Sequence, residues 1–374
     1  MTTLIAWRNL AQDRVRLLIT LTGIVLSVVL MGMQIGLLVG FADSTSCLVR
    51  HSHADLWLTS QGTKTVDYTQ WLDERWRFQA LAVPEVIRAE PYFVTFIGWS
   101  RPDGGTESVS LVGLETNAQL GGPWNLVEGH KEDLALPSAV IVDRLYASKL
   151  GVSAIGDSVE INGRRARVVG FTRGIRTFTQ SPYVFTSIDN ARAFAGAPAT
   201  RAGYLLLKVD PRASVEAVRR RLQQRMPDLV LLTRDELASS STHYWLFTTG
   251  AGISLGMSAL LGLIVGIAIV AQTLYASTID RLPEYATLKA MGAPSSYLYR
   301  IILTQASMAA AVGFALGMSL VLLLVINARS ASAAPQLTPA LVALLGVLTF
   351  AMCMGAAVLS IRKILTIDPV GVFR

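Results

Sequence analysis

The sequence predicts a membrane protein with four transmembrane α-helices in a 1+3 arrangement and a large α+β extracytoplasmic domain inserted between helices 1 and 2. The evidence is four long stretches without Asp, Glu, Lys or Arg, and one very large gap between the first stretch and the second. The stretches are Leu17 to Ala42, Tyr244 to Ile279, Ile301 to Ala328 and Ser330 to Ile361. Each exceeds the roughly 20 apolar residues that cross a bilayer. In hydrocarbon, one segment satisfies all its own backbone hydrogen bonds only as a helix.

The placement of the basic residues predicts which side of the membrane each segment faces. The net charge is +7, yet Asp43 to Trp245 hold 23 Lys and Arg against 22 Asp and Glu. Nine of the ten other basic residues flank one side of the predicted spans, and only Arg329 flanks the other. Because Lys and Arg are retained on the cytosolic side, we expect both termini and the loop between helices 2 and 3 to be cytosolic. The charge therefore indicates topology, and we expect no nucleic acid as a partner.

The N-terminal residues 1–16 are predicted to form a cytosolic amphipathic helix in the membrane interface. Trp7 and Arg8 stand in a mixture of apolar and charged residues at helical spacing. A frayed cytosolic tail is the alternative. The next apolar run is longer than that of a secretory signal and no A-x-A-like site follows it, so we interpret it as an uncleaved helix.

The remaining boundaries follow from the charges and the composition. We expect transmembrane helix 1 at 17–42, the extracytoplasmic domain at 43–243, helix 2 at 246–275, a cytosolic loop and helix at 276–299, helix 3 at 301–327, a short extracytoplasmic loop at 328–337, helix 4 at 338–361 and a cytosolic tail at 362–374.

The inserted block has the composition of a folded α+β domain. Short alternating apolar runs predict strands at Ala54–Leu58, Val94–Trp99, Val109–Leu114, Val159–Ile161, Ala166–Phe171 and Tyr204–Val209. Asn162-Gly163 accepts positive φ and predicts a tight hairpin between two of these runs. Helices are predicted at Ser138–Leu150 and at Ser214–Met226, where Ser214 suits an N-cap. Strands mixed with a few helices predict an α+β fold.

One aromatic-rich segment of this domain leaves its structure open. Tyr68 to Ala80 fits a third helix or an aromatic lobe. Its aromatic residues Trp71, Trp76 and Phe78 are expected to be core residues rather than ligand contacts.

Neither a metal site nor a catalytic site is expected. His51 and His53 form an H-x-H pair without a further His or Cys at local ligand spacing. Cys47 and Cys353 are predicted on different sides of the topology and cannot pair within the chain. The spans hold no ionisable residue, so neither an ion-coupled carrier nor an intramembrane hydrolase is predicted.

Glycines at four-residue spacing are the notable feature of the spans. Gly32, Gly36 and Gly40 lie in the first helix, and Gly252 and Gly256 in the second; further pairs are Gly262 with Gly266 and Gly313 with Gly317. Small-residue stripes allow close helix contact in lipid. We assign the first stripe to contacts that include a second copy of the chain. Packing within a single copy is the alternative.

The cytosolic segment before the third span has the signals of a short helix. Pro283 can begin it, Glu284 suits its first turn, Lys289 its end, and Gly292 a C-terminal cap. Such a helix, held between two spans, could pass motion from a soluble partner into both. A solvated connector would have a similar sequence.

The residues at this point resemble the permease subunits of MacB/FtsX-type ABC transporters. The matching motifs are E-Y-A-T-L-K-A-M-G-A at Glu284–Ala293, the outer-block segments Ala139–Gly151, Ile155–Gly163 and Ala166–Phe171, W-R-N-L at Trp7–Leu10, and D-P-V-G-V-F-R at Asp368–Arg374. These motifs are spread over nearly the whole chain. Their order, together with the 1+3 helix layout, makes the resemblance specific. The short single-permease form, with Gln34 in its first helix, is most similar to the DevC branch.

The resemblance implies a homodimer in the bacterial cell (inner) membrane, bound to two cytosolic ABC ATPase subunits. It implies contact with the ATPase through Glu284, Tyr285, Leu288, Lys289, Met291 and Gly292. The chain has no G-x-x-x-x-G-K-[ST] motif, so it is not expected to be an enzyme or to hold a cofactor, and ATP and Mg belong to the partner. Further expected partners are membrane lipids and a periplasmic membrane-fusion adaptor protein, with export of a lipid-like or other amphipathic substrate. The alternative is a membrane-anchored sensor whose outer domain binds a ligand and signals through the loop.

Overall fold

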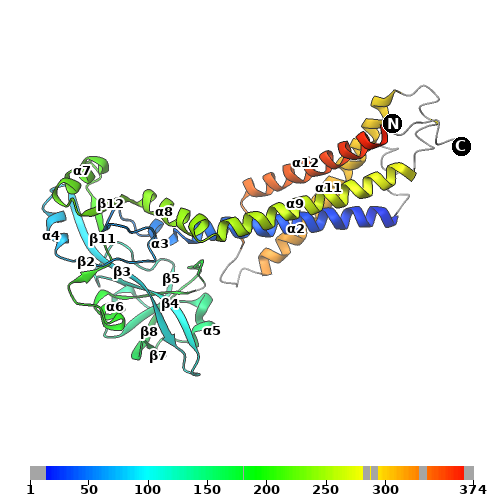
Figure 1. Cartoon of the computed structure of the whole chain (residues 1–374). Helices are drawn as coiled ribbons and strands as arrows, with labels where there is room; N and C mark the ends of the chain where they lie inside the picture. Colours follow the sequence, from blue (N-terminus) through cyan, green and yellow to red (C-terminus); the bar gives the residue numbers. More distant parts are fainter. Residues whose placement is uncertain (1–13, 180, 281–286, 288–293, 328–334, 366–374) are drawn as a thin grey trace. The chain divides into compact units, whose positions relative to one another are not determined.

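The computed structural model describes residues 14–179, 181–280, 287, 294–327 and 335–365 (Figure 1). These residues form two compact units. One unit is helical and is drawn from residues 14–39, 252–327 and 335–365, and the other is an α+β unit of residues 40–251.

The helical unit is built from four long helices that lie side by side (Figure 1). They are α2 (Arg14–Ser44), α9 (Ala251–Asp280), α11 (Ser295–Asn327) and α12 (Pro339–Leu365). All four are long and apolar enough to cross a membrane, over Leu17–Ser44, Ala251–Thr273, Tyr299–Asn327 and Pro339–Val358. Outward-facing leucines such as Leu261 and Leu323 are 57% and 58% exposed. A large apolar exterior of this kind is typical of a surface that lipid covers. The predicted 1+3 arrangement around an inserted domain is confirmed.

The α+β unit contains one large mixed sheet and a small two-stranded one. The strands are β1 (Leu56–Ser60), β2 (Leu72–Asp73), β3 (Val86–Ser100), β4 (Thr106–Leu114), β5 (Leu126–Glu128), β6 (Ala139–Asp143), β7 (Ser158–Ile161), β8 (Arg164–Thr172), β9 (Tyr183–Ser187), β10 (Arg201–Ala202), β11 (Tyr204–Val209) and β12 (Leu229–Thr233). In the large sheet the order is β12-β1-β11-β3-β4-β9-β6-β8-β5, and β7 pairs with β3 and β8. Strand β10 pairs with β2.

Short helices cover the sheet and connect its strands. They are α3 (Cys47–Arg50), α4 (Trp76–Leu81), the 3₁₀ turns η1 (Lys131–Ala135) and η2 (Arg144–Tyr146), α5 (Ala147–Leu150), α6 (Ile188–Ala195), α7 (Val215–Arg225), α8 (Arg234–His243) and the π-helical turn η3 (Tyr244–Thr248).

Successive side chains of the long strand β3 point to opposite faces of the sheet and so belong to different buried clusters. Tyr92 and Val94 belong to one buried cluster with residues of α3 and α8. Phe93 points to the other face and belongs to a second cluster with residues of β6, β8 and α6. A third cluster lies where α4 and α7 cover β1 and β11. The period of two that predicted these strands is therefore the period that divides the core.

Most of the predicted elements of this domain are confirmed. Five of the six predicted strand runs lie in strands, and Ala54–Leu58 overlaps β1, which begins at Leu56. The helix predicted at Ser214–Met226 is α7. The hairpin between β7 and β8 turns on Asn162 and Gly163, whose φ angles are 50° and 73°. Positive φ at both central residues is the requirement of a type I′ turn, which explains the Asn-Gly pair.

Two predictions for this domain are wrong in part. The first half of the predicted helix Ser138–Leu150 is strand β6, which is buried throughout and pairs with β8 and β9. Its β-branched residues fill a central strand position, and helical structure begins only after Asp143 accepts a hydrogen bond from Leu145 N. Of the aromatic residues expected in the core, only Trp76 packs there. Trp71 and Phe78 are 45% and 67% exposed.

Candidate functional site

The predicted ATPase contacts lie outside the described residues. They are Glu284, Tyr285, Leu288, Lys289, Met291 and Gly292. The same holds for the interfacial residues Trp7 and Arg8. The structure describes the helices on either side of the loop, α9 up to Asp280 and α11 from Ser295. The coupling role of the loop therefore stays a prediction.

The predicted glycine stripes take part in packing within one chain. A Cβ added at Gly32 or Gly36 would lie 3.1 Å from Val321 or from Pro335. A Cβ at Gly256, by contrast, would meet nothing within 4 Å. Gly40 lies near the end of α2 and Gly252 in the first turn of α9. Contact of any of these glycines with a second copy stays a prediction.

Two of the other predicted glycines lie closer still to neighbouring helices. A Cβ at Gly317 would be 2.8 Å from the Cβ of Val28, and one at Gly266 would overlap the side chains of Ser27 and Met352. Ser27 also donates a hydrogen bond from Oγ to the carbonyl of Gly262, at 2.8 Å. Small residues and one interhelical hydrogen bond thus hold α2 against α9 and α11.

In the α+β unit, a cluster around Trp245 joins segments far apart in the sequence. The indole Nε1 of Trp245 donates to Asp67 Oδ2 at 3.0 Å and to Thr65 Oγ1 at 3.1 Å. Thr65 Oγ1 also donates to Asp67 Oδ2, at 3.0 Å. Asp67 is only 3% exposed, and this burial raises the pKa of its carboxyl to about 6. A buried carboxyl is tolerated here because both of its neighbours donate hydrogen bonds to it.

Aromatic rings surround this hydrogen-bonded centre. The ring of Tyr68 stacks on Trp245 at 5.8 Å, and Phe178 approaches Trp245 to 4.5 Å between ring centroids. Phe41, near the end of α2, meets Phe178 edge to face at 5.4 Å. We call Phe41, Asp67, Tyr68, Phe178 and Trp245 the Trp245 cluster. The indole of Trp245 lies in η3. Although π-helical turns are rare in proteins, those that occur are often found at functional positions.

Helix α8 and strand β11 hold the segment that carries Asp67. The Val66 amide donates to Ser241 Oγ at 3.2 Å, and Ser240 Oγ donates to the carbonyl of Lys64 at 2.9 Å. The hydroxyl of Tyr204, on β11, donates to the carbonyls of Thr65 and Val66. Together, α8 and β11 thus hold this segment through backbone groups on three successive residues, Lys64, Thr65 and Val66.

The loop that carries Phe178 is fastened on its other side to β6. The buried Asp143 carboxylate accepts hydrogen bonds from Thr172 Oγ1, Gly174 N and Ile175 N, at 2.8 to 3.1 Å. The hydroxyl of Tyr146 accepts one from Thr177 N at 3.2 Å. Through this loop the Trp245 cluster is connected to the core of β6, β8 and α6.

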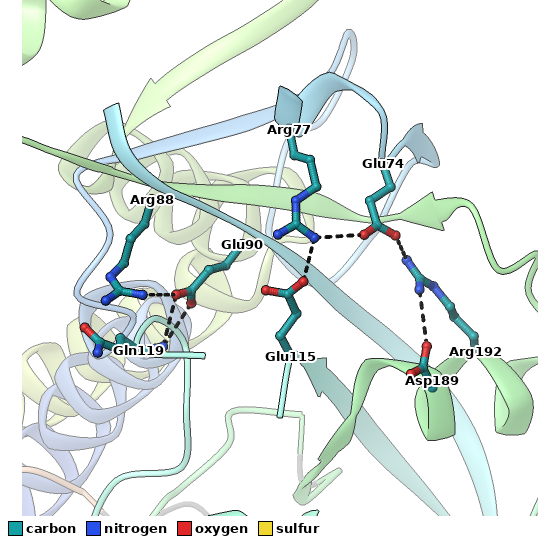
Figure 2. Close-up of polar contacts among 8 residues, drawn as sticks. All are labelled: Glu74, Arg77, Arg88, Glu90, Glu115, Gln119, Asp189 and Arg192. Atoms are coloured by element: carbon teal, nitrogen blue, oxygen red, sulfur yellow. Dashed lines mark hydrogen bonds and ion pairs between the residues drawn. The ribbon is translucent and has the colours of Figure 1, made fainter. Parts of the chain in front are cut away.

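A charged network joins α4 to α6 (Figure 2). The Glu74 carboxylate lies between two guanidinium groups, 3.2 Å from Arg77 and 2.5 Å from Arg192. Arg77 also pairs with Glu115 at 2.6 Å, and Arg192 with Asp189 at 3.5 Å. The Arg192 side chain is only 8% exposed. Since α4 and α6 pack on different core clusters, the network braces two parts of the domain.

Glu90 holds a neighbouring loop in the same way (Figure 2). Its carboxylate accepts from the amides of Gln119 and Leu120 at 2.9 to 3.1 Å and lies 3.6 Å from Arg88.

His51 has a packing role that the sequence did not predict. Its ring stacks on Trp124 at 4.3 Å between centroids, and its Nδ1 lies 2.8 Å from the carbonyl oxygen of Cys47. In the part of the chain that the structure describes, no three His, Cys, Asp or Glu side chains are grouped to hold a metal. The contacts found in this domain fasten segments together.

Comparison with known proteins gives two matches that together cover most of the chain. Residues 17–225 match the model of the MacB-like periplasmic core domain, and residues 256–369 match that of the FtsX-like permease C-terminal domain. The two matches occur in the order in which the inserted domain and the last three helices follow one another.

Curated relatives come from Mycobacterium tuberculosis. The uncharacterized ABC transporter permease protein Rv0987 is 24% identical over 192 residues, which is 50% of this chain and 22% of that protein. The uncharacterized ABC transporter permease Rv0072 is 26% identical over 241 residues, or 62% of this chain and 61% of that protein. The chain thus spans about a fifth of the first relative and about three-fifths of the second.

Two solved structures resemble the inserted domain distantly. The periplasmic region of MacB from Actinobacillus actinomycetemcomitans has a TM-score of 0.40 and 11% identity, over 51% of this chain and 94% of that one. The extracellular domain of the ABC-type transporter YknZ from Gram-positive bacteria has a TM-score of 0.36 and 12% identity, over 48% and 99%. Likeness at this level does not indicate what the domain binds.

Proposed function

Since the chain belongs to the MacB/FtsX-type family of ABC transporter permeases, we propose that it is the transmembrane subunit through which a separate cytosolic ATPase moves the inserted α+β domain. ATP and Mg are held by that ATPase, and a second copy of this chain completes the permease. Both termini and residues 276–299 lie in the cytosol of a bacterial cell, and the inserted domain lies outside its inner membrane.

One observation carries this proposal. Both segments by which the inserted domain connects to helices are tied to its interior: Phe41 at the end of α2 through Phe178, and Trp245 in η3 through Asp67. A displacement of either segment therefore moves the side chains that it contacts inside the domain, instead of being absorbed by a flexible linker. The network of Glu74 and Arg192 supports movement of the domain as one body.

The proposed substrate is lipid-like or otherwise amphipathic and is handled together with a periplasmic adaptor protein. The exposed aromatic side chains Trp71 and Phe78 support an apolar ligand, since large exposed rings on a soluble domain are typical of binding surfaces. The relatives that are named ABC transporter permeases support a transport role over that of a sensor.

Coupling to the ATPase is assigned to the loop that follows α9. We propose that Glu284 and Lys289 make charged contacts with the ATPase, while Tyr285, Leu288, Met291 and Gly292 shape an apolar face. The test is co-purification of the permease with its ATPase, together with ATP turnover in lipid nanodiscs, for the double variant Glu284→Gln, Leu288→Ala. Both binding and turnover are expected to fall.

The matched control removes one carboxylate and one leucine side chain from exposed positions in the inserted domain. Glu216 has a 60% exposed side chain and Leu136 is 53% exposed, and both lie in the inserted domain. The variant Glu216→Gln, Leu136→Ala is expected to bind and turn over like the wild type. If the loop variant also behaves like the wild type, the assignment of the coupling segment is wrong.

A further inference from the structure

The aromatic rings around Trp245 form a group separate from the core of their domain. Phe41, Phe178, Trp245 and Tyr68 contact one another in series, and Tyr244 and Phe96 contact Tyr68 at 6.2 and 6.4 Å. These six rings are absent from the buried clusters of the α+β unit. Tyr68 is 54% exposed although three aromatic rings, those of Phe96, Tyr244 and Trp245, contact it. The domain thus presents a partly open aromatic surface.

Helix length places one end of this group beyond the hydrocarbon. The apolar run of α2 has 28 residues, Leu17–Ser44. At about 1.5 Å per residue it is roughly 42 Å long, against a hydrocarbon core of about 30 Å. Counted from Leu17, the core ends near Gly36, and Phe41 lies roughly 7 Å further along the helix. That depth is the headgroup layer, which is about 5 to 8 Å thick on each side.

The second connection also lies next to an apolar run. Trp245 precedes Ala251, the start of that run, by six residues, in the π-helical turn η3, which is followed by a bend at Gly250. Two segments far apart in the sequence therefore carry Phe41 and Trp245 beside the ends of apolar runs, where the lipid headgroups lie. Tyr and Trp prefer this level because their rings are apolar while their O–H and N–H groups find polar partners.

We infer that the open side of this aromatic group, with Tyr68 as its most exposed ring, binds the phospholipid headgroup layer of the outer leaflet. Tyr68 belongs to the segment between β1 and β2 and lies outside every apolar run, so the contact belongs to the inserted domain itself. Its hydroxyl would meet the glycerol and phosphate region while its ring covers Trp245. The inference rests on the membrane spans and on the proposed side of the inserted domain, and it stands whether or not an ATPase couples to the loop.

The experiment replaces Tyr68 with the photoreactive amino acid benzoylphenylalanine in the full chain, reconstituted in nanodiscs of phosphatidylethanolamine and phosphatidylglycerol. The control is the same replacement at Leu136, which is 53% exposed in the same domain and has no proposed binding role. After illumination, intact mass measurement is expected to show phospholipid adducts at position 68 in several-fold higher yield than at position 136. Equal yields, no lipid adduct at 68, or adducts only to a second protein chain would overturn the inference.

A second measurement leaves the chain unaltered, which covers the case that the Tyr68 variant does not fold. Nanodiscs are doped with a phospholipid that carries a diazirine on its headgroup, and the crosslinked peptides of the wild-type chain are mapped. Adducts are expected on the segments that contain Tyr68 and Tyr244 to Phe247, and adducts on the latter alone would contradict binding through Tyr68.

Discussion

The buried carboxyl of Asp67 makes the stability of the α+β unit depend on pH. Its pKa is raised from the ordinary 3.8 to about 6, chiefly because burial disfavours the charged form. The folded state therefore keeps this proton to a higher pH than the unfolded state does. The sign follows directly: the contribution of Asp67 to stability is greatest below the ordinary pKa and falls as the pH rises through about 6.

Replacement of Asp67 by Asn removes this titration while its Oδ1 still accepts from Trp245. Between about pH 4 and pH 7, the unfolding free energy of the wild type should fall relative to that of Asp67→Asn by up to about 3 kcal/mol. Thermal unfolding of the detergent-solubilised chain at a series of pH values measures this difference.

The control for Asp67 has the opposite sign. Hydrogen bonds from the amides of Ser153 and Ala154 hold the pKa of the Asp157 carboxyl below its usual range. Its stabilising effect is therefore lost as the pH falls, and Asp157→Asn should show the reverse trend. Parallel curves for wild type and Asp67→Asn would show that Asp67 titrates normally and is not held as described.

Two acidic residues on Arg192 should differ strongly in their effect on stability. Glu74→Gln leaves a guanidinium that is only 8% exposed without its closest charged partner, and should lower the unfolding free energy by about 2–3 kcal/mol. Asp189→Asn removes the charge of a side chain that is 88% exposed and lies 3.5 Å from Arg192, and should cost less than about 0.5 kcal/mol. Denaturant unfolding of both variants measures the difference. Equal losses would mean that the network does not brace α4 against α6.

At the scale of the elements, glycine packing in the helices gives a matched pair of variants. A methyl group at Gly266 would overlap Ser27 and Met352, so Gly266→Ala should destabilise the helical unit by about 1–3 kcal/mol. A methyl group at Gly256 meets nothing within 4 Å, so Gly256→Ala should be neutral or slightly stabilising. Thermal unfolding in detergent compares the two. A neutral Gly266→Ala would show that α9 packs elsewhere.

The predicted contact with a second copy is assigned to the stripe of Gly32, Gly36 and Gly40, and Gly256 tests whether the second helix contributes to it. If the stripe of Gly252 and Gly256 packs against another chain, Gly256→Ala should weaken self-association in crosslinking or sedimentation while leaving the thermal unfolding of the single chain unchanged. Unchanged association would remove these two glycines from the proposed interface.

The elements that the sequence could predict are those with local signals. Asn162-Gly163 predicts its turn because Asn and Gly readily adopt the positive φ angles that the turn needs. Ser214–Met226 shows the helical period, and the helix found there has 11 residues. Strand β6 lacks such a signal because Ala139–Asp143 is buried by β8 and β9, which lie later in the chain. A short apolar run that ends against a helical turn is consistent with either structure until its neighbours are known.

For the whole molecule, the charge-free runs predict the 1+3 layout because a single segment in hydrocarbon satisfies all its backbone hydrogen bonds only as a helix. The Trp245 cluster could not be predicted in the same way. Asp67 and Trp245 are 178 residues apart, and no local pattern relates them. A Trp six residues before an apolar run is a usable signal for the headgroup layer, but not for its carboxylate partner. The coupling residues at 284–292 were predicted by resemblance alone.

The central claim is that the loop after α9 and the inserted domain lie on opposite sides of the membrane, so that force on one reaches the other. Site-directed labelling tests it most directly. Single cysteines replace Glu216 and Lys289 in turn, in a chain whose Cys47 and Cys353 are changed to Ser, and an impermeant maleimide is added to cells with the outer barrier opened. Position 216 should be labelled at once and position 289 only after the inner membrane is permeabilised. Labelling of position 289 in intact membranes, or protection of position 216, would contradict the account.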